Sequence, residues 1–262
     1  MTSLFNLFVQ LPDLVILVVG AAATAGLALA IALLTRRFWF APRADRLETH
    51  TKLADLVHSG LLAFAVFLLA LVLSDVRANL GRADDATLRE ASVLTRLDRE
   101  LSLIGDSARD ARVRLRAYAD AIVSDEWLTL GRAEPELSGK AEGLLRALNR
   151  DVHALAANNP AVASQLRALF DRAEDLRQGR LENATKSIAS IFWWMIGAFV
   201  LGAMAMNGRN PVDANSATLI LLHMAPIGLV MSLIIVMDEP FRGETSISSA
   251  PIAKALTSGP AP

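Results

Sequence analysis

The chain has 262 residues, a net charge of −1 and no cysteine. A charge so close to zero gives no support to nucleic-acid binding, and the lack of cysteine excludes disulfides and thiolate metal sites. Hydrophobic residues make up 53% of the sequence, but they are concentrated in two apolar blocks that flank a charged middle of about a hundred residues. This division indicates an integral membrane protein whose apolar blocks contact the lipid bilayer.

Four segments are long and apolar enough to cross that bilayer. They run from Leu14 to Leu34, from Leu56 to Ser74, between Lys186 and Arg209, and between Asp213 and Asp238. A helix needs roughly 20 residues to cross the hydrocarbon core, and runs of this length exceed a barrel strand. The first segment lacks the basic start and short apolar core of a cleaved signal peptide, so we expect a mature helix.

Basic residues set the expected orientation. The two turns, residues 36–55 and 207–216, hold six Lys or Arg residues, whereas the first thirteen residues and the tail together hold two. This bias favours cytoplasmic turns, with both termini and the charged middle outside the cytoplasm. Arg77, Arg82 and Arg89 lie close to a membrane end and argue for the opposite orientation.

The charged middle continues from the second span as a helical seam. Apolar residues recur at alternating steps of three and four, which is typical of one stripe along a bundle helix. Counting back by the same steps leads through Glu90 to Val76, so we expect one nearly continuous helix from the bilayer to Ile122. The stripe comprises Leu94, Leu97, Leu101, Ile104, Ala108, Ala111, Leu115, Tyr118 and Ile122.

Two further helices are expected in the middle. One covers Leu137–Ala156, and the other begins near Ala161 and runs on into the third span, with turn residues between them. We therefore predict an all-α fold with four transmembrane helices and a helical-bundle insert between spans two and three. The expected domains are membrane helices 1 and 2 with their basic turn (1–76), the soluble insert (77–187), membrane helices 3 and 4 (188–237) and a tail (238–262).

Glu90 is the first candidate for a functional polar residue, because it stands at a seam position that calls for an apolar side chain. A buried carboxylate is costly unless it is paired, so we expect an Arg partner on a neighbouring helix. Three alternatives remain open: partial solvation at a loose bundle end, selection of helix register, and ion binding.

His223 is the only ionisable side chain deep in a predicted span, and such residues are candidates for function. Pro226 removes the backbone donor for the carbonyl of Leu222, which places a kink and a free acceptor beside the imidazole. A pore or proton-transfer role and a simple helix–helix hydrogen bond are the alternatives. In the second span, Phe64 and Phe67 are candidates for an apolar constriction that gates a pore by dewetting.

No catalytic constellation is recognisable in the sequence. It has no glycine-rich phosphate loop, no nucleophile elbow and no histidine pair at metal-ligand spacing. We therefore predict no cofactor, no metal site and no enzymatic activity. Ala22, Gly26 and Ala30 form small-residue steps that permit close helix packing, within the chain or between copies of it.

Four short stretches of the sequence resemble the bestrophin-like family of bacterial membrane proteins. Their order and spacing match from about residue 56 onward: Arg89-Glu90-Ala91 with Leu94 and Leu97; Arg114-Leu115 and Tyr118 with Glu126-Trp127; Arg180-Leu181 with Ile191-Phe192-Trp193; and Asp238-Glu239-Pro240-Phe241-Arg242-Gly243 with Ile247 and Pro251. The resemblance implies four spans with a helical insert, in a bacterial inner (plasma) membrane. True bestrophins are distant pentameric anion channels, and no copy of their pore neck or calcium-binding acidic cluster is recognisable here.

An oligomeric ion channel is therefore the leading functional hypothesis. One membrane helix from each copy of a homo-oligomer would line an axial pore for inorganic ions. The alternative is a membrane sensor or scaffold whose helical insert binds a partner or ligand. A membrane-embedded enzyme is the third hypothesis, and no residues recommend it.

Overall fold

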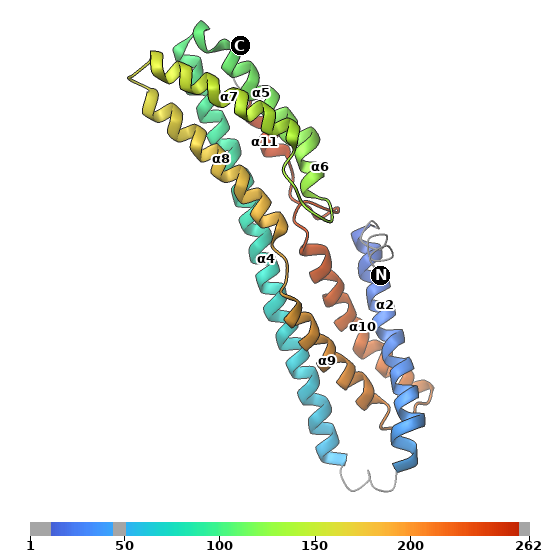
Figure 1. Cartoon of the computed structure of the whole chain (residues 1–262). Helices are drawn as coiled ribbons and strands as arrows, with labels where there is room; N and C mark the ends of the chain where they lie inside the picture. Colours follow the sequence, from blue (N-terminus) through green and yellow to red (C-terminus); the bar gives the residue numbers. More distant parts are fainter. Residues whose placement is uncertain (1–11, 44–50, 257–262) are drawn as a thin grey trace. The chain divides into compact units, whose positions relative to one another are not determined.

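A computed structural model describes residues 12–43 and 51–256 of the chain. Every regular element within these residues is helical (Figure 1). Four stretches are long and apolar enough to cross a membrane, so the predicted all-α fold with four membrane-spanning helices is confirmed. Arg46, which the orientation argument counts, lies outside the described residues. The four stretches are Asp13–Phe40, Lys52–Ile104, Ala163–Asn207 and Ala214–Met237.

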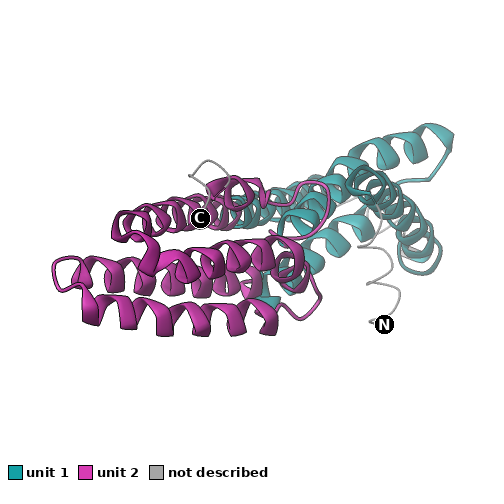
Figure 2. Cartoon of the chain, turned by 90° about the horizontal axis from the view of Figure 1, so that it is seen from above, with its two compact units in different colours: residues 1–77, 187–238 teal, residues 78–186, 239–262 magenta. Residues whose placement is uncertain are grey.

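The chain divides into two compact units (Figure 2). Unit 1 comprises Met1–Arg77 and Ser187–Asp238. It contains α2 (Asp13–Thr35), the first part of α4 (Thr51–Ile104), α9 (Ser190–Asn207) and α10 (Ala214–Met237). The π-helical turn η1 (Arg36–Phe40) and the 3₁₀ turn η2 (Ala41–Arg43) follow α2. These helices carry the apolar spans.

Close approach of small residues joins α2 to α10 in unit 1. A Cβ atom added to Gly228 would lie 2.5 Å from the side chain of Thr24, and one added to Gly20 would lie 1.7 Å from Ser232 Oγ. Only glycine permits this backbone separation. By contrast, Gly26 has open space around its Cα, and Ala22 and Ala30 are exposed. The small-residue step that the sequence suggests is therefore not used between the described helices of a single chain.

Unit 2 comprises Ala78–Lys186 and Glu239–Pro262. After the remainder of α4 come η4 (Asp106–Ala108), α5 (Arg109–Ala121), the π-helical η5 (Ile122–Glu126) and α6 (Trp127–Leu130). The helices α7 (Gly139–Asn158), α8 (Ala163–Thr185) and α11 (Ala250–Ala255) complete the unit. The tail packs within this unit, because Ile252 is fully buried in its apolar core and Thr95 Oγ1 donates a hydrogen bond to the Ala255 carbonyl at 3.0 Å.

The expected continuous helix to Ile122 is wrong, because the chain reverses direction at Gly105. Here φ is 84° and ψ is −148°, a backbone region that is essentially open to glycine alone. Arg112 Nε donates to Asp98 Oδ1 at 2.9 Å across the turn, although these residues would be about 21 Å apart along one helix. The end of α4 and α5 therefore lie side by side and antiparallel (Figure 1).

The apolar stripe survives this reversal. Its members on both sides of Gly105 enter one buried core with residues of α7, α8 and α11, and only Ile104 is partly exposed. A second expectation is also wrong: α8 ends at Thr185, and residues 186–189 are not helical before α9 begins. The buried members of the stripe are Leu94, Leu97, Leu101, Ala108, Ala111, Leu115, Tyr118 and Ile122.

The turn at Gly105 generates a stability prediction. Gly105→Ala should destabilise unit 2 by about 1–3 kcal/mol, because alanine is strained at this φ although the space around the Cα is open. Gly143→Ala is the matched control, since Gly143 lies inside α7 with equally open space and alanine favours a helix. Thermal unfolding in detergent compares the two variants, and equal melting temperatures would contradict the assigned strain.

Candidate functional site

Two arginine side chains of α8 are buried inside unit 2. Arg177 is 3% exposed and Arg180 is fully buried. They lie three residues apart, on the helix face that also buries Leu166, Phe170 and Ala173. A buried guanidinium must be paired and hydrogen-bonded to offset its desolvation. The partners come from α4 and from the end of η5.

Glu90 of α4 is one of these partners, and it is fully buried. Arg180 Nε lies 2.7 Å from Glu90 Oε2, and the NH2 group of Arg180 donates to Glu90 Oε1 at 3.1 Å. The expected burial of Glu90 and its pairing with an arginine on another helix are therefore observed. Partial solvation at a loose bundle end is excluded.

Glu126 joins the two arginines. Its carboxylate accepts from Arg177 NH2 at 2.6 Å, from Arg180 NH2 at 2.8 Å and from the backbone N–H of Ser138 at 3.1 Å. Glu126 is the last residue of the π-helical turn η5 and is fully buried. π-Helical turns are rare and recur at functional sites. We call Glu90, Glu126, Arg177 and Arg180 the buried ion network.

The network extends to the start of α7. Ser138 caps this helix, because its Oγ accepts from the backbone N–H groups of Lys140 and Ala141. Arg177 also donates to the Ser138 carbonyl, at 3.2 Å, and to the carboxylate of Glu142. The hydrogen bond from Arg177 holds the pKa of Glu142 below its ordinary value. Unlike the four central groups, Glu142 reaches solvent.

Two aromatic side chains adjoin the network. The guanidinium carbon of Arg180 lies 5.7 Å from the ring centroid of Trp127, within the range of a cation–π interaction. Tyr118 is fully buried, and its hydroxyl has no hydrogen-bond partner in the described part of the chain. Burial raises the pKa of Tyr118 well above its ordinary value, and the nearby Glu90 carboxylate adds to this shift.

Trp127 also connects the network to the tail. Its indole N–H donates to the Ile247 carbonyl at 3.1 Å, and its ring packs edge-on against Phe241 at 5.2 Å. Gly131 allows this approach, because a Cβ atom there would lie 2.8 Å from the Phe241 carbonyl oxygen. The tail turns back at Gly243, where φ is 83°. The stretch from Glu239 to Ile247 therefore docks against α6.

The network is suited to holding helices together rather than to exchanging protons or binding ions. Two carboxylates and two guanidiniums balance in charge, and arginine remains protonated at any physiological pH. The hydrogen bonds that these four side chains make go to one another, to Ser138 or to Glu142. Within residues 12–43 and 51–256, no group of three or more His, Asp or Glu side chains is arranged to hold a metal ion.

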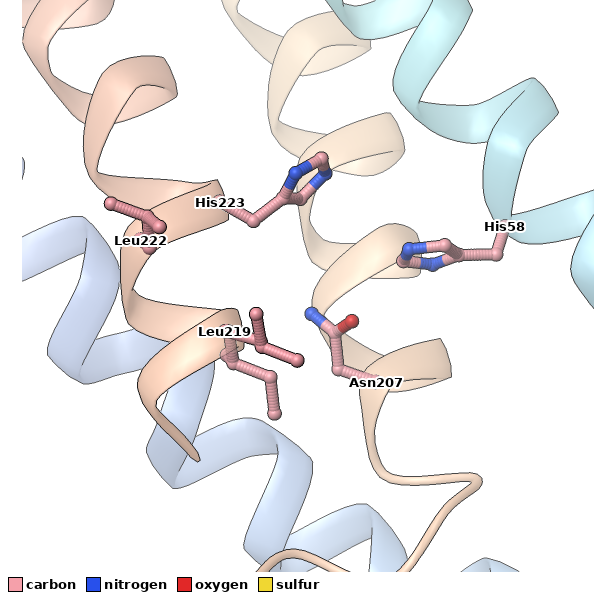
Figure 3. A pocket seen from close by; sticks show the side chains of 6 residues that line it. His58, Asn207, Leu219, Leu222 and His223 are labelled. Atoms are coloured by element: carbon pink, nitrogen blue, oxygen red, sulfur yellow. The ribbon is translucent and has the colours of Figure 1, made fainter. Parts of the chain in front are cut away.

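The other candidate residues lie in unit 1. Phe64 and Phe67 are 60% and 65% exposed, and Phe64 stacks on Phe199 of α9 with ring centroids 5.6 Å apart. His223 is an exposed residue of α10, and its ring faces His58 of α4 with centroids 6.5 Å apart (Figure 3). The structure thus does not bring Glu90 together with the other three candidates.

Sequence reasoning missed three members of the network. As neighbours on a helix, Asp125 and Glu126 are expected to point in different directions, but both contact Ser138. Arg177 and Arg180 look like solvated residues in a charged segment. The available signal was their position, because both continue the apolar stripe of α8 by steps of three and four.

The family model for the bestrophin-like domain matches residues 22–252 of the chain. The chain belongs to the bestrophin-like family. A crystal structure of a membrane protein, a proline-to-alanine variant, is similar to this bestrophin-like chain with a TM-score of 0.61 and 13% identity. The similarity covers 90% of this chain and 96% of that one, and it shows a shared fold. A search of curated proteins gives no match.

The stretches that resemble the bestrophin-like family meet in the same region of unit 2. The first supplies Glu90, the second supplies Tyr118, Glu126 and Trp127, and the third supplies Arg180. The fourth supplies Phe241, which packs on Trp127. In this bestrophin-like protein the matching stretches therefore include three of the four residues of the buried ion network, together with the Trp127–Phe241 contact of the tail.

The buried ion network predicts that Glu90 and Arg180 depend on each other for the stability of unit 2. Glu90→Gln should destabilise unit 2 by about 3–5 kcal/mol, because Arg180 keeps its charge in a buried place with one partner fewer. Glu90→Leu and Arg180→Met should each cost a similar amount, and the variant that carries both should cost less than the sum of these two single changes.

The exposed ion pair of Arg89 and Asp85 provides the control for this experiment. These two side chains are both 64% exposed, so Arg89→Ala should cost less than about 1 kcal/mol. Thermal and denaturant unfolding in detergent measure all the variants. Near-native unfolding of Glu90→Gln would show that the carboxylate contributes no net stability, contrary to the argument from burial.

Proposed function

We propose that this bestrophin-like membrane protein is a homo-oligomeric ion channel. Membership of the family and a fold shared with another membrane protein support this proposal. The observation that carries it is the exposed apolar face of α4. Large side chains on this face are between 44% and 69% exposed in a single chain: Leu53, Leu56, Val57, Phe64, Phe67 and Leu71.

An exposed apolar helix face within a membrane contacts either lipid or another copy of the protein. We place α4 beside the axis of the oligomer, where Phe67 from each copy forms a ring. A ring of large apolar side chains narrows a pore and gates it by dewetting. Phe64 lies one turn away and is held by its stacking on Phe199, so it supports the same constriction. Inorganic ions are the transported species, and we propose no catalytic activity.

The buried ion network supports this function indirectly. A pore that several copies share requires each copy to present α4 in one fixed register. Paired buried charges are among the interactions that select a register, and they join α4 to α8 and η5 here. The alternative function, a membrane sensor or scaffold that binds a partner through unit 2, requires no conductance.

The channel proposal is tested with purified protein in a planar bilayer. The wild-type protein should conduct ions and should be an oligomer by mass measurement in mild detergent. Phe67→Ala should raise the open probability or conductance several-fold, because a smaller side chain wets the constriction. Phe67 is the better target, since Phe64 also packs within the chain.

Leu27→Ala is the matched control, because Leu27 is 51% exposed on α2, away from the proposed pore helix. It should leave the conductance unchanged. A monomer at all concentrations would remove the shared pore. Oligomers that conduct nothing under any ionic condition would favour the scaffold.

We further propose that the protein resides in the bacterial inner membrane with unit 2 outside the cytoplasm. The six basic residues of the turns, against two at the termini, support this orientation. In this cysteine-free chain, Asn158→Cys should react with a membrane-impermeant thiol reagent in intact spheroplasts, and Ala41→Cys should react only after lysis. Both residues are exposed, so accessibility is matched. The reverse labelling pattern would invert the orientation.

A further inference from the structure

A pocket in unit 1 carries two imidazoles that the proposed function does not use. Its volume is about 420 Å³. His58 of α4 and His223 of α10 face each other across it, and Asn207 at the end of α9 lies beside them (Figure 3). The remaining lining residues are apolar: Leu219, Ile220 and Leu222.

Two buried polar atoms in this pocket lack a hydrogen-bond partner within the described chain. They are His58 Nδ1 and Asn207 Nδ2. His58 also makes a hydrogen bond to the backbone carbonyl of Ala203 on α9. This carbonyl holds the ring of His58 in place, and the ring faces His223 across the pocket (Figure 3). Metal-binding histidines are commonly oriented in this way by a backbone carbonyl.

The separation of the rings suits a shared metal ion. Two imidazoles that bind one ion at about 2.0–2.1 Å have ring centroids roughly 5–6 Å apart. The observed separation is 6.5 Å, and His223 is an exposed side chain that is free to approach by the difference. Imidazole nitrogen prefers zinc, copper and nickel to magnesium or calcium.

The charges near the pocket permit a cation. Arg209 and Asp55 are the charged groups that act on His58. They form an ion pair with 2.5 Å between Arg209 NH2 and Asp55 Oδ1, so the carboxylate offsets part of the positive charge beside the pocket. We propose that His58 and His223 bind one transition-metal cation of the zinc, copper or nickel class, with Asn207 positioned to hydrogen-bond a water ligand of the ion. The bound ion links α4 to α10, whether or not the protein conducts.

The experiment uses full-length protein in detergent after removal of any polyhistidine tag. The chain contains four histidines and no cysteine, so few other strong ligands compete. Zinc binding is measured by calorimetry, and cobalt is used as a spectroscopic probe because nitrogen ligands change its visible absorption. Zinc should raise the melting temperature of the wild-type protein, and magnesium at the same concentration should not.

His58→Ala and His223→Ala should each weaken zinc binding by at least about tenfold. His153→Ala is the matched control, because His153 is an exposed residue of α7 in unit 2, and it should bind zinc as the wild-type protein does. If His58→Ala fails to fold, His223→Ala decides the question, since this side chain is exposed. The proposal is overturned if the wild-type protein binds no zinc, or if His223→Ala binds it with unchanged affinity.

Discussion

The buried pairing of Arg177 and Arg180 with Glu90 and Glu126 is the interaction on which unit 2 depends. Glu90, Glu126 and Arg180 have no access to water and Arg177 is almost fully buried, so the four rely largely on one another for the hydrogen bonds that they lose on folding. The carboxylates come from α4 and η5 and the guanidiniums from α8, which means that the three elements must be placed together. An apolar core tolerates small sliding of helices, whereas paired charges with fixed hydrogen bonds do not. The network therefore fixes specific contacts between the three elements, and the apolar seam supplies most of the burial.

The sequence predicts the spans and the buried face well because both are expressed as composition and periodicity. Nineteen residues without Asp, Glu, Lys or Arg define the second span, and a regular alternation of steps marks the core residues from Leu94 to Ile122. The position of Glu90 in that alternation was enough to predict a buried carboxylate with an arginine partner. It could not identify Arg180, because seventeen other arginines and lysines of the charged middle (residues 77–187) have the same local appearance. Only the tertiary fold distinguishes a buried arginine from a solvated one.

The reversal at Gly105 was missed for a related reason. The spacing from Leu101 through Ile104 to Ala108 continues the seam without a gap, so periodicity alone cannot distinguish one long helix from two helices that share a core. The local signal was the Gly105-Asp106-Ser107 sequence, whose residue types favour turns. Glu126 was missed because a π-helical turn shifts the register of the residues that follow it, and an analysis based on steps of 3.6 residues misplaces them.

The docking of the tail has a consequence for the order in which the protein is made. Arg180 and Glu90 are separated by 90 residues, and Trp127 and Ile247 by 120. During synthesis, the glutamates of α4 and η5 emerge from the ribosome well before the arginines that neutralise them. The segment that packs on Trp127 follows only after both later spans have been translated. Unit 2 thus combines a segment that precedes α9 with a segment that follows α10. Its completion must wait for the insertion of both helices. Contacts between residues so far apart in the sequence slow folding. Until they form, the nascent chain has unpaired charges and an uncovered aromatic surface, which chaperones recognise.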